Sequence, residues 1–436
     1  MTTIWQGHQP TIMCNDAWTI SDLLEKKANI YSSRPRMIAM GDMINATENN
    51  QVCLVYGDRW RLHRRLMHTA VGSQAVRPLR HIQAYESQIL VRDLMEKPDD
   101  YPSTYNDTLP HYPKRVLKLP KTTFAKRLYN KKEKNGLDDA EIATLTSNLI
   151  GGGVDTTSGT TIAFLLAMCA FPNVQQKAHE ELDKVVGQDR VPDWNDENSL
   201  PYVKAVVSEV LRWRTVTILG GIPHAPIQDD DYRGYFIPKG TPITGNVWAI
   251  HRNPRDFPDP DVFRPERFYG GLERPYPNKQ GHNAFGWGRR VCSGQPLAEQ
   301  GLFMTIATLL WAFDIRPGLD ENGNELNLDT SIDAYQFAGF RDFAKTSLDK
   351  YHLEYAFHHC DKCSYHASHN CVFHLGRSAA YWLILRGLPL PGNPYDDTLR
   401  WRREGNVWTP KEYSLGGRRY SVSPWSKQNL RSVWRG

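Results

Sequence analysis

The segment FGWGRRVCSG, residues 285–294, sets one cysteine in a short loop rich in glycine and arginine. An apolar helix is predicted directly behind it, over 296–313. Because a helix N-terminus presents free N–H groups, and Arg289 and Arg290 add positive charge, we expect Cys292 to favour its thiolate form. A thiolate serves as a nucleophile or a metal ligand, and a buried structural cysteine is the alternative. Three glycines would let a bulky planar partner approach: Gly286, Gly288 and Gly294.

The composition is that of a globular protein. The 436 residues are 40% hydrophobic, which is enough for a sizeable core. The longest apolar run, at 162–171, is shorter than the roughly 20 residues that a membrane-spanning helix needs. The first residues lack the basic start and apolar stretch of a secretory signal. The seven cysteines do not indicate a disulfide scaffold, so we predict a reducing compartment.

Helical periodicity dominates the body of the chain. Asp138 and Glu141 are spaced as a capping pair at the start of its longest helix. Small β-hairpins are expected between 215 and 244, and the proline-dense segment 253–268 is expected to be irregular. Helices are predicted over 60–72, 80–97, 138–171, 173–187, 200–213 and 296–313.

Five positions of the opening loop match the pattern FxxGxRxCxG: Phe285, Gly288, Arg290, Cys292 and Gly294. The rest of the chain contains WxxxR (Trp60, Arg64), GGVDTT at 152–157, ExxR (Glu209, Arg212) and PERF at 265–268, which includes Arg267. With this set the chain resembles the cytochrome P450 family of haem-thiolate monooxygenases, and fungal secondary-metabolism members most. The resemblance implies a mainly α fold with small β-sheets, and haem b with Cys292 as its axial iron ligand.

The family resemblance also implies a buried network of Glu209, Arg212 and Arg267 behind the haem. From spacing alone, Glu209 and Arg212 would be an ordinary surface pair. GGVDTT combines residues that weaken a helix. By resemblance, this helix opens locally over the haem, Thr156 hydrogen-bonds dioxygen and Asp155 relays protons; a purely structural role is the alternative.

Two carboxylates of a buried haem need cationic or N–H donors. The resemblance assigns this role to Trp60, Arg64, His224 and Arg290, although an ordinary β-turn histidine is the alternative for His224. Phe285, Gly288 and Gly294 complete the implied cofactor-binding set.

The implied reaction inserts one oxygen atom from O2 into a small apolar organic substrate. Electrons would come from NADPH through a separate NADPH-cytochrome P450 reductase, because no flavin domain is predicted. The family suggests the cytosolic face of the endoplasmic reticulum membrane; with no anchor predicted here, a cytoplasmic location is the alternative. The basic helix over 60–72 could bind phosphate backbones, but without a recognised binding module we expect no nucleic-acid partner.

We assign residues 1–330 to a partial domain of this family, and the resemblance is specific over about 18–97 and about 137–330. We expect this domain to begin inside the fold, without the first β-sheet, and to be shortened over 98–137. Residues 331–436 form an atypical tail that is disordered or non-native. From residue 341 onward it has 15 Lys and Arg against 8 Asp and Glu. The tail also has zinc-ligand candidates at Cys360, Cys363, His366, His369, Cys371 and His374. The remaining alternatives are therefore a truncated inactive relative, and a non-enzymatic zinc- or nucleic-acid-binding protein.

Overall fold

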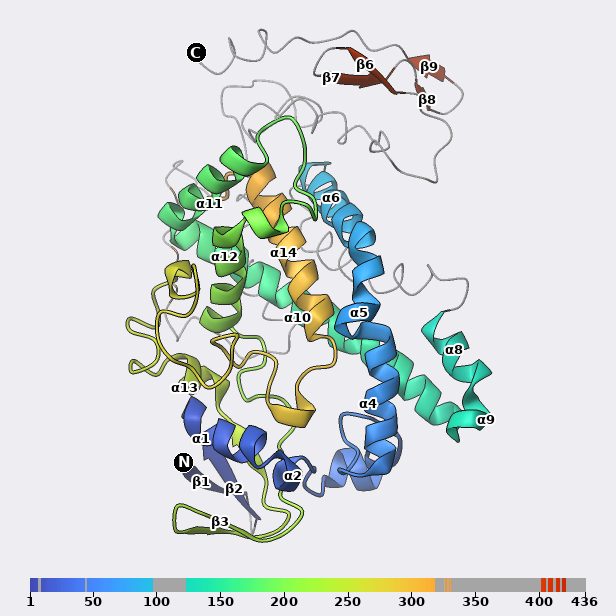
Figure 1. Cartoon of the computed structure of the whole chain (residues 1–436), viewed down its shortest axis with the longest axis vertical. Coiled ribbons are helices and arrows are strands. Elements are labelled where there is room, and N and C mark those ends of the chain that lie inside the picture. The colour runs from blue at the N-terminus through green and yellow to red at the C-terminus, as the bar shows by residue number, and fades with distance from the viewer. Residues whose placement is uncertain are drawn as a thin grey trace.

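The computed structural model describes residues 1–6, 9–43, 45–96, 123–317, positions 325, 328 and 330, and four short strands between 401 and 420. The described body is mostly helical, with small sheets near the N-terminus (Figure 1). The longer helices are α4 (Asp58–Val71), α6 (Arg80–Glu96), α8 (Phe124–Asn130), α10 (Asp139–Ala170), α11 (Pro172–Val185), α12 (Pro201–Trp213) and α14 (Gln295–Ala312). The predicted mainly α architecture with small β-sheets is therefore present in the described body.

Short helices connect these elements. The α-helical ones are α1 (Ala17–Ser21), α2 (Ala28–Tyr31), α3 (Ala46–Asn49), α5 (Ser73–Val76), α9 (Lys132–Asn135) and α13 (Val247–His251). Two π-helical turns are η1 (Asp22–Lys26) and η2 (Ile38–Met43). The 3-10 turns are η3 (Arg77–Leu79), η5 (Glu197–Ser199), η6 (Pro265–Arg267) and η7 (Gly288–Arg290).

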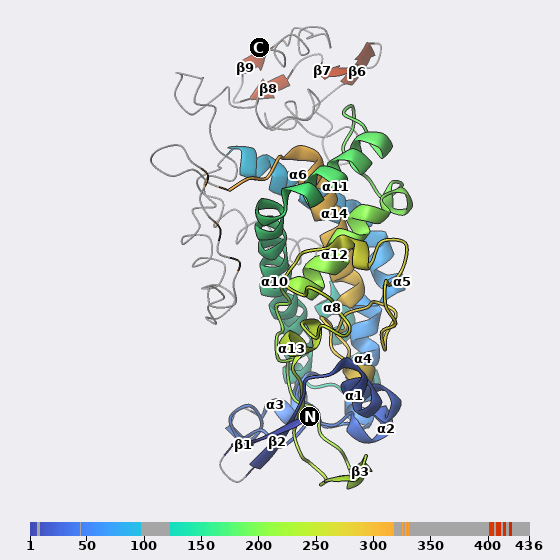
Figure 2. The same cartoon turned by 90° about the vertical axis from the view of Figure 1, so that its left-hand side faces the viewer.

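Helix α14 is central to the packing of the body. It contacts α6, α10, α11 and α12; Figure 1 shows α10 crossing it obliquely, and Figure 2 shows α10 extending along much of the body. The side chains of α14 from Leu302 to Ala312 are buried, as are those of α10 from Ser158 to Cys169. The apolar surface removed from water along these two helices forms the largest core cluster.

The start of α10 confirms the predicted capping pair. The Asp138 side chain accepts a hydrogen bond from the N–H of Glu141, and the Glu141 side chain accepts one from the N–H of Asp138. The prediction that the first β-sheet is missing was wrong. Strands β1 (Thr2–Gln6) and β2 (Gln9–Cys14) pair antiparallel, and β2 pairs parallel with β5 (Ile243–Gly245), so a first sheet is present.

The predicted hairpin region contains β3 (Asp230–Tyr232) and β4 (Tyr235–Ile237), which pair antiparallel. Their two connecting residues, Arg233 and Gly234, both have positive φ, as a tight two-residue hairpin turn requires. In the tail, where no regular element was predicted, β6 (Trp401–Glu404) pairs with β7 (Val407–Pro410), and β8 (Tyr413–Leu415) with β9 (Arg418–Tyr420).

Several sequence predictions concern residues outside the described ranges. They are the loop from Pro98 to Pro120 and all of 331–400, which includes the Cys and His cluster at 358–374. Among the described residues, no single helix has the length and apolar composition to cross a membrane; α10 and α11 pass that test only together, bent by 103°.

Candidate functional site

Cys292 lies in the loop between η7 and α14, and its backbone N–H donates to the carbonyl of Phe285 over 2.9 Å. Its side chain is exposed, whereas Cys14, Cys53 and Cys169 are buried. Because the Cys292 thiol is exposed just before the start of α14, it is available to a ligand. The alternative of a buried structural cysteine is therefore wrong for Cys292.

The protonation of Cys292 differs from the sequence prediction. The N–H groups of Gly294 and Gln295 and the charge of Arg64 lower the pKa of the thiol, but the surrounding protein atoms limit its hydration and raise the pKa overall. The two arginines expected to help lie elsewhere. Arg289 contacts Tyr56, and Arg290 donates to three backbone carbonyls. A bound cation such as a metal ion would favour the thiolate.

Three arginines gather beside this loop. Arg290 donates to the carbonyls of Ser32, Gln51 and Leu54, and its guanidinium lies 4.5 Å from the centre of the Trp60 ring. Arg64 donates to the Ser293 hydroxyl over 2.7 Å. Arg34 donates to the carbonyls of Val52, Ile222 and Pro223. Within the described residues, none of the three has a carboxylate partner.

Burial lowers the pKa values of two arginines in this cluster, and for Arg290 repulsion from the other arginines adds to it. Burial, with the charges of Arg34 and Arg64, lowers the pKa of Arg290 to about 8. Burial also lowers the pKa of Arg34 to about 10. The cluster would therefore be stabilised by a bound dianion, which is what a pair of carboxylates provides.

His224 belongs to the same cluster. It is buried, its Nδ1 lies 3.0 Å from the carbonyl oxygen of Tyr31, and its backbone bridges to Ile243. Since that carbonyl only accepts, Nδ1 carries the proton. Burial and the charges of Arg34 and Arg290 lower the pKa of His224 to about 3, so the ring is neutral. His224 is therefore not an ordinary β-turn histidine.

Arg34 was missed by the sequence analysis. The signal was an arginine directly before a proline in YSSRPR, a position that fixes an extended backbone. The carbonyl groups that Arg34 contacts are distant in the sequence: Val52 is 18 positions away and Ile222 is 188 positions away. No local pattern could have identified these contacts.

The middle of α10 is the second exposed feature of the site. Gly151 and Gly152 are exposed, and a Cβ added at either would meet no atom within 4 Å outside the nearby helix backbone. Asp155 and Thr156 are partly buried, and among the described residues Asp155 has no hydrogen-bond or ion-pair partner. The expected local opening of this helix is wrong: α10 is continuous, and the Thr156 hydroxyl donates to the Gly152 carbonyl over 2.7 Å.

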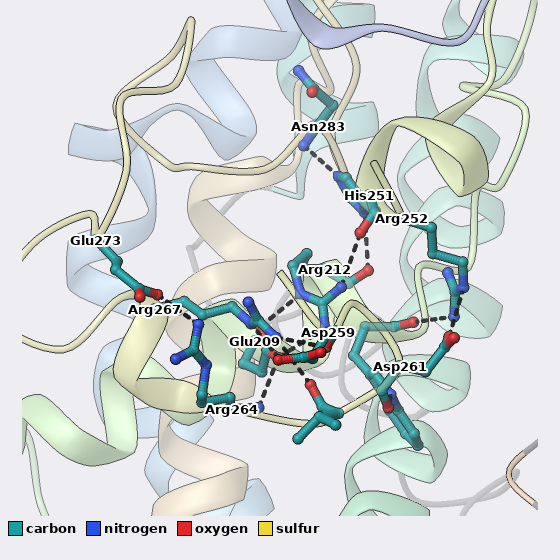
Figure 3. A network of polar contacts seen from close by, with 12 residues as sticks. Glu209, Arg212, His251, Arg252, Asp259, Asp261, Arg264, Arg267, Glu273 and Asn283 are labelled. Atoms are coloured by element: carbon teal, nitrogen blue, oxygen red, sulfur yellow. Dashed lines mark hydrogen bonds and ion pairs between the residues drawn. The ribbon is translucent and has the colours of Figure 1, made fainter. Parts of the chain in front are cut away.

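The network predicted behind the site is present and fully buried (Figure 3). Arg212 Nε and Nη2 donate to the two Glu209 carboxylate oxygens over 2.7 and 2.8 Å, and both side chains have 0% exposure. Arg267 Nε lies 3.4 Å from the Glu209 Oε1 atom. The surface-pair alternative for Glu209 and Arg212 is therefore wrong.

The comparisons with known proteins agree with this geometry. The family described as Cytochrome P450 matches residues 1–117 and 106–330. The chain belongs to the cytochrome P450 family. It is similar to cytochrome P450 monooxygenase 58 of Postia placenta (31% identity over 73% of this chain and 76% of the relative). It is also similar to cytochrome P450 monooxygenase COX2 of Coprinopsis cinerea (32% identity over 73% and 77%).

A solved structure of a zebrafish cytochrome P450 with abiraterone shares the fold, with a TM-score of 0.58 at 23% identity, covering 71% of this chain and 87% of that one. The cytochrome P450 family comprises haem-thiolate monooxygenases, so this chain is an oxidoreductase of that class and its cofactor is haem b. The fungal resemblance is confirmed by the relatives.

The described residues fit haem b on three observations. The exposed Cys292 thiol would be able to ligate the iron of a bound haem. Among the described residues the arginine cluster has no carboxylate partner, so it suits the two propionates. Gly151 and Gly152, in the exposed middle of α10, carry no side chain that could obstruct a bulky ring.

Replacing Gly288 with alanine is expected to prevent haem incorporation. Gly288 has φ +54°, and an added Cβ would lie 2.1 Å from the Leu24 carbonyl oxygen, so the loop must move. Gly286→Ala is the matched control, because Gly286 also has positive φ (+79°) but no atom within 4 Å of its added Cβ. Both variants carry a backbone cost of about 1 kcal/mol or more. Haem content per protein should fall strongly only for Gly288→Ala. An equal fall in Gly286→Ala would show that the contact with the Leu24 carbonyl is not the cause.

Proposed function

We propose that this cytochrome P450 inserts one oxygen atom of O2 into a small apolar organic substrate, with Cys292 as the axial ligand of haem b. The exposed Cys292 thiol beside an arginine cluster without carboxylates carries the proposal. The bound haem supplies an iron centre that activates O2, one atom entering the substrate and the other leaving as water. The residues of the chain hold that cofactor, orient O2 and deliver protons.

Trp60, Arg64, His224 and Arg290 bind the propionates in this proposal, together with Arg34. Arg64 and Arg290 each contribute charge-assisted hydrogen bonds. Trp60 holds the Arg290 guanidinium through a ring contact of 4.5 Å. Phe285, Gly288 and Gly294 shape the loop that presents the sulfur. The contact of 2.9 Å between Cys292 N and the Phe285 carbonyl supports that role.

Thr156→Ala is expected to keep haem but to divert reducing equivalents into hydrogen peroxide. In this proposal the Thr156 hydroxyl orients O2 and Asp155 carries protons to it from solvent. The lack of a partner for Asp155 in the described residues leaves its carboxylate available. Peroxide released per NADPH consumed should rise severalfold in Thr156→Ala. Thr160→Ala, which removes a hydroxyl bonded to the Thr156 carbonyl one turn later, is the control; a similar rise in that variant would contradict the assignment.

The apolar class of the substrate is supported by the segment that follows α12. Leu219 is 46% exposed, and Ile218 and Ile222 are half-buried near it in the sequence. Electrons come from NADPH through NADPH-cytochrome P450 reductase in this proposal. Exposed Arg61, Arg65 and Arg289 provide positive charge near the Cys292 loop that would attract an acidic reductase. The proposed location is the cytosolic face of the endoplasmic reticulum membrane.

The test uses the full chain expressed with ample haem precursor. The reduced, carbon-monoxide-treated protein should show the Soret band of a thiolate ligand. With reductase, NADPH and ¹⁸O-labelled O2, an apolar probe such as a long-chain fatty acid or a terpene should gain one labelled oxygen. A protein that takes up no haem would instead support the truncated inactive relative.

A further inference from the structure

Beyond the roles already assigned, one buried histidine connects the Glu209 network to the Cys292 loop. His251 is the last residue of α13 and is 0% exposed. Its Nδ1 lies 3.0 Å from the Arg212 carbonyl oxygen, and its Nε2 lies 2.8 Å from the backbone nitrogen of Asn283. Figure 3 shows the ring between Arg212 and Asn283.

We propose that His251 is a positioning residue that fixes the Cys292 loop onto the Glu209 network, and so sets the geometry of the sulfur that the proposed function makes the iron ligand. The sequence analysis did not single it out, because nothing around His251 marks it as different from a surface histidine.

The two contacts specify one form of the ring. The Arg212 carbonyl can only accept, so Nδ1 must carry the proton; the Asn283 N–H can only donate, so Nε2 must be unprotonated. The imidazole is therefore neutral. Burial, with the charges of His282 and Arg212, holds the pKa of His251 well below its ordinary value, in agreement with this form.

His251 and Arg212 also join the ends of two helices. Arg212 lies in the last turn of α12, where backbone carbonyls have no partner inside the helix. His251 Nδ1 donates to that Arg212 carbonyl, and Arg212 Nη1 donates back to the His251 carbonyl at the end of α13 over 2.9 Å. Glu209 holds the same guanidinium from the other side.

The bond between His251 Nε2 and the Asn283 N–H connects the two helix ends to the Cys292 loop. Asn283 lies two positions before Phe285, and its carbonyl accepts the N–H of Gly286 over 3.1 Å in a tight turn. Phe285 in turn accepts the N–H of Cys292. Three hydrogen bonds therefore connect His251 to the residue that carries the sulfur: His251 to Asn283, Asn283 to Gly286, and Phe285 to Cys292.

His251→Phe tests the proposal, because phenylalanine keeps a ring but removes both hydrogen bonds. We expect this variant to bind haem while a large fraction of its reduced carbon monoxide complex loses the thiolate Soret band. In the haem-free protein, amide hydrogen exchange over 283–292 should accelerate about tenfold or more, as expected for losing a buried hydrogen bond. His251→Gln, whose amide both donates and accepts, should restore most of the thiolate band and of the protection.

Leu182→Ala is the control for general destabilisation, because Leu182 is a fully buried residue of α11. It should lower the melting temperature without changing the carbon monoxide spectrum or exchange over 283–292. A His251→Phe protein with the full thiolate band and wild-type exchange would overturn the proposal. So would equal changes in Leu182→Ala.

Two further measurements keep the proposal independent of other failures. If His251→Phe does not fold, hydrogen exchange of the Asn283 backbone amide in the wild-type protein still tests the proposal. This amide should exchange as slowly as the amides of α12. Exchange as fast as that of an exposed loop amide would overturn the proposal. If the wild-type protein lacks a thiolate band, the proposed role of Cys292 fails, whereas exchange in the haem-free protein still tests His251.

Discussion

Cys292→Ala is expected to abolish both the thiolate spectrum and turnover while leaving the fold intact. The Cys292 side chain is exposed and belongs to none of the apolar core clusters, so its loss should change the free energy of unfolding by only about 0.5 kcal/mol. The backbone bond from Cys292 to Phe285 does not need the sulfur. In the proposed function, by contrast, the substitution would remove the sulfur that ligates the haem iron, and with it the electron density that favours O–O cleavage. The reduced carbon monoxide spectrum and product formation measure the effect.

Cys169→Ala provides the comparison for the cysteine variant. Cys169 is buried in α10, and burial raises the pKa of its thiol to about 12, so it is an inert structural cysteine. Its replacement should cost packing energy and keep the spectrum. A Cys292→Ala protein with an unchanged thiolate band and continued oxygenation would assign the ligand to another cysteine.

The helices of this protein were predictable because their signals are local. The capping pair of Asp138 and Glu141 and the apolar period before Pro172 fix α10 within a residue or two. The Cys292 loop was predictable for a different reason. Its glycines meet strict steric demands, such as the Leu24 carbonyl against Gly288, and such demands leave a recognisable pattern.

The parts that could not be predicted depend on contacts between distant segments. The first sheet requires the parallel pairing of Ile12 with Ile243, which no short pattern encodes. Arg34 and His251 act through backbone carbonyls and amides, whose positions a sequence does not show. The pKa of Cys292 was misjudged because sequence proximity to Arg289 and Arg290 was taken as spatial proximity, whereas Arg64 is the arginine whose charge lowers that pKa.

Glu209→Ala is expected to be the most destabilising of these substitutions. Glu209 accepts two bonds from Arg212 and one from the N–H of Arg264, and it lies within 3.4 Å of Arg267. Removing the carboxylate leaves the charge of Arg212 buried at 0% exposure with no acid to balance it. By analogy with other broken buried pairs, the free energy of unfolding should fall by roughly 3–5 kcal/mol. Urea unfolding of the haem-free protein measures this directly.

Glu273→Ala separates the buried network from an ordinary ion pair, because Glu273 bonds Arg264 at 2.7 Å with both side chains more than a third exposed. Its loss should cost at most about 1 kcal/mol. Glu209→Gln should fall between the two, since the amide oxygen can still accept the Arg264 N–H while the negative charge is gone. If Glu209→Ala cost no more than Glu273→Ala, burial of Glu209 and Arg212 would have no energetic consequence. The network would then hold the Cys292 loop through the hydrogen bonds of His251 alone.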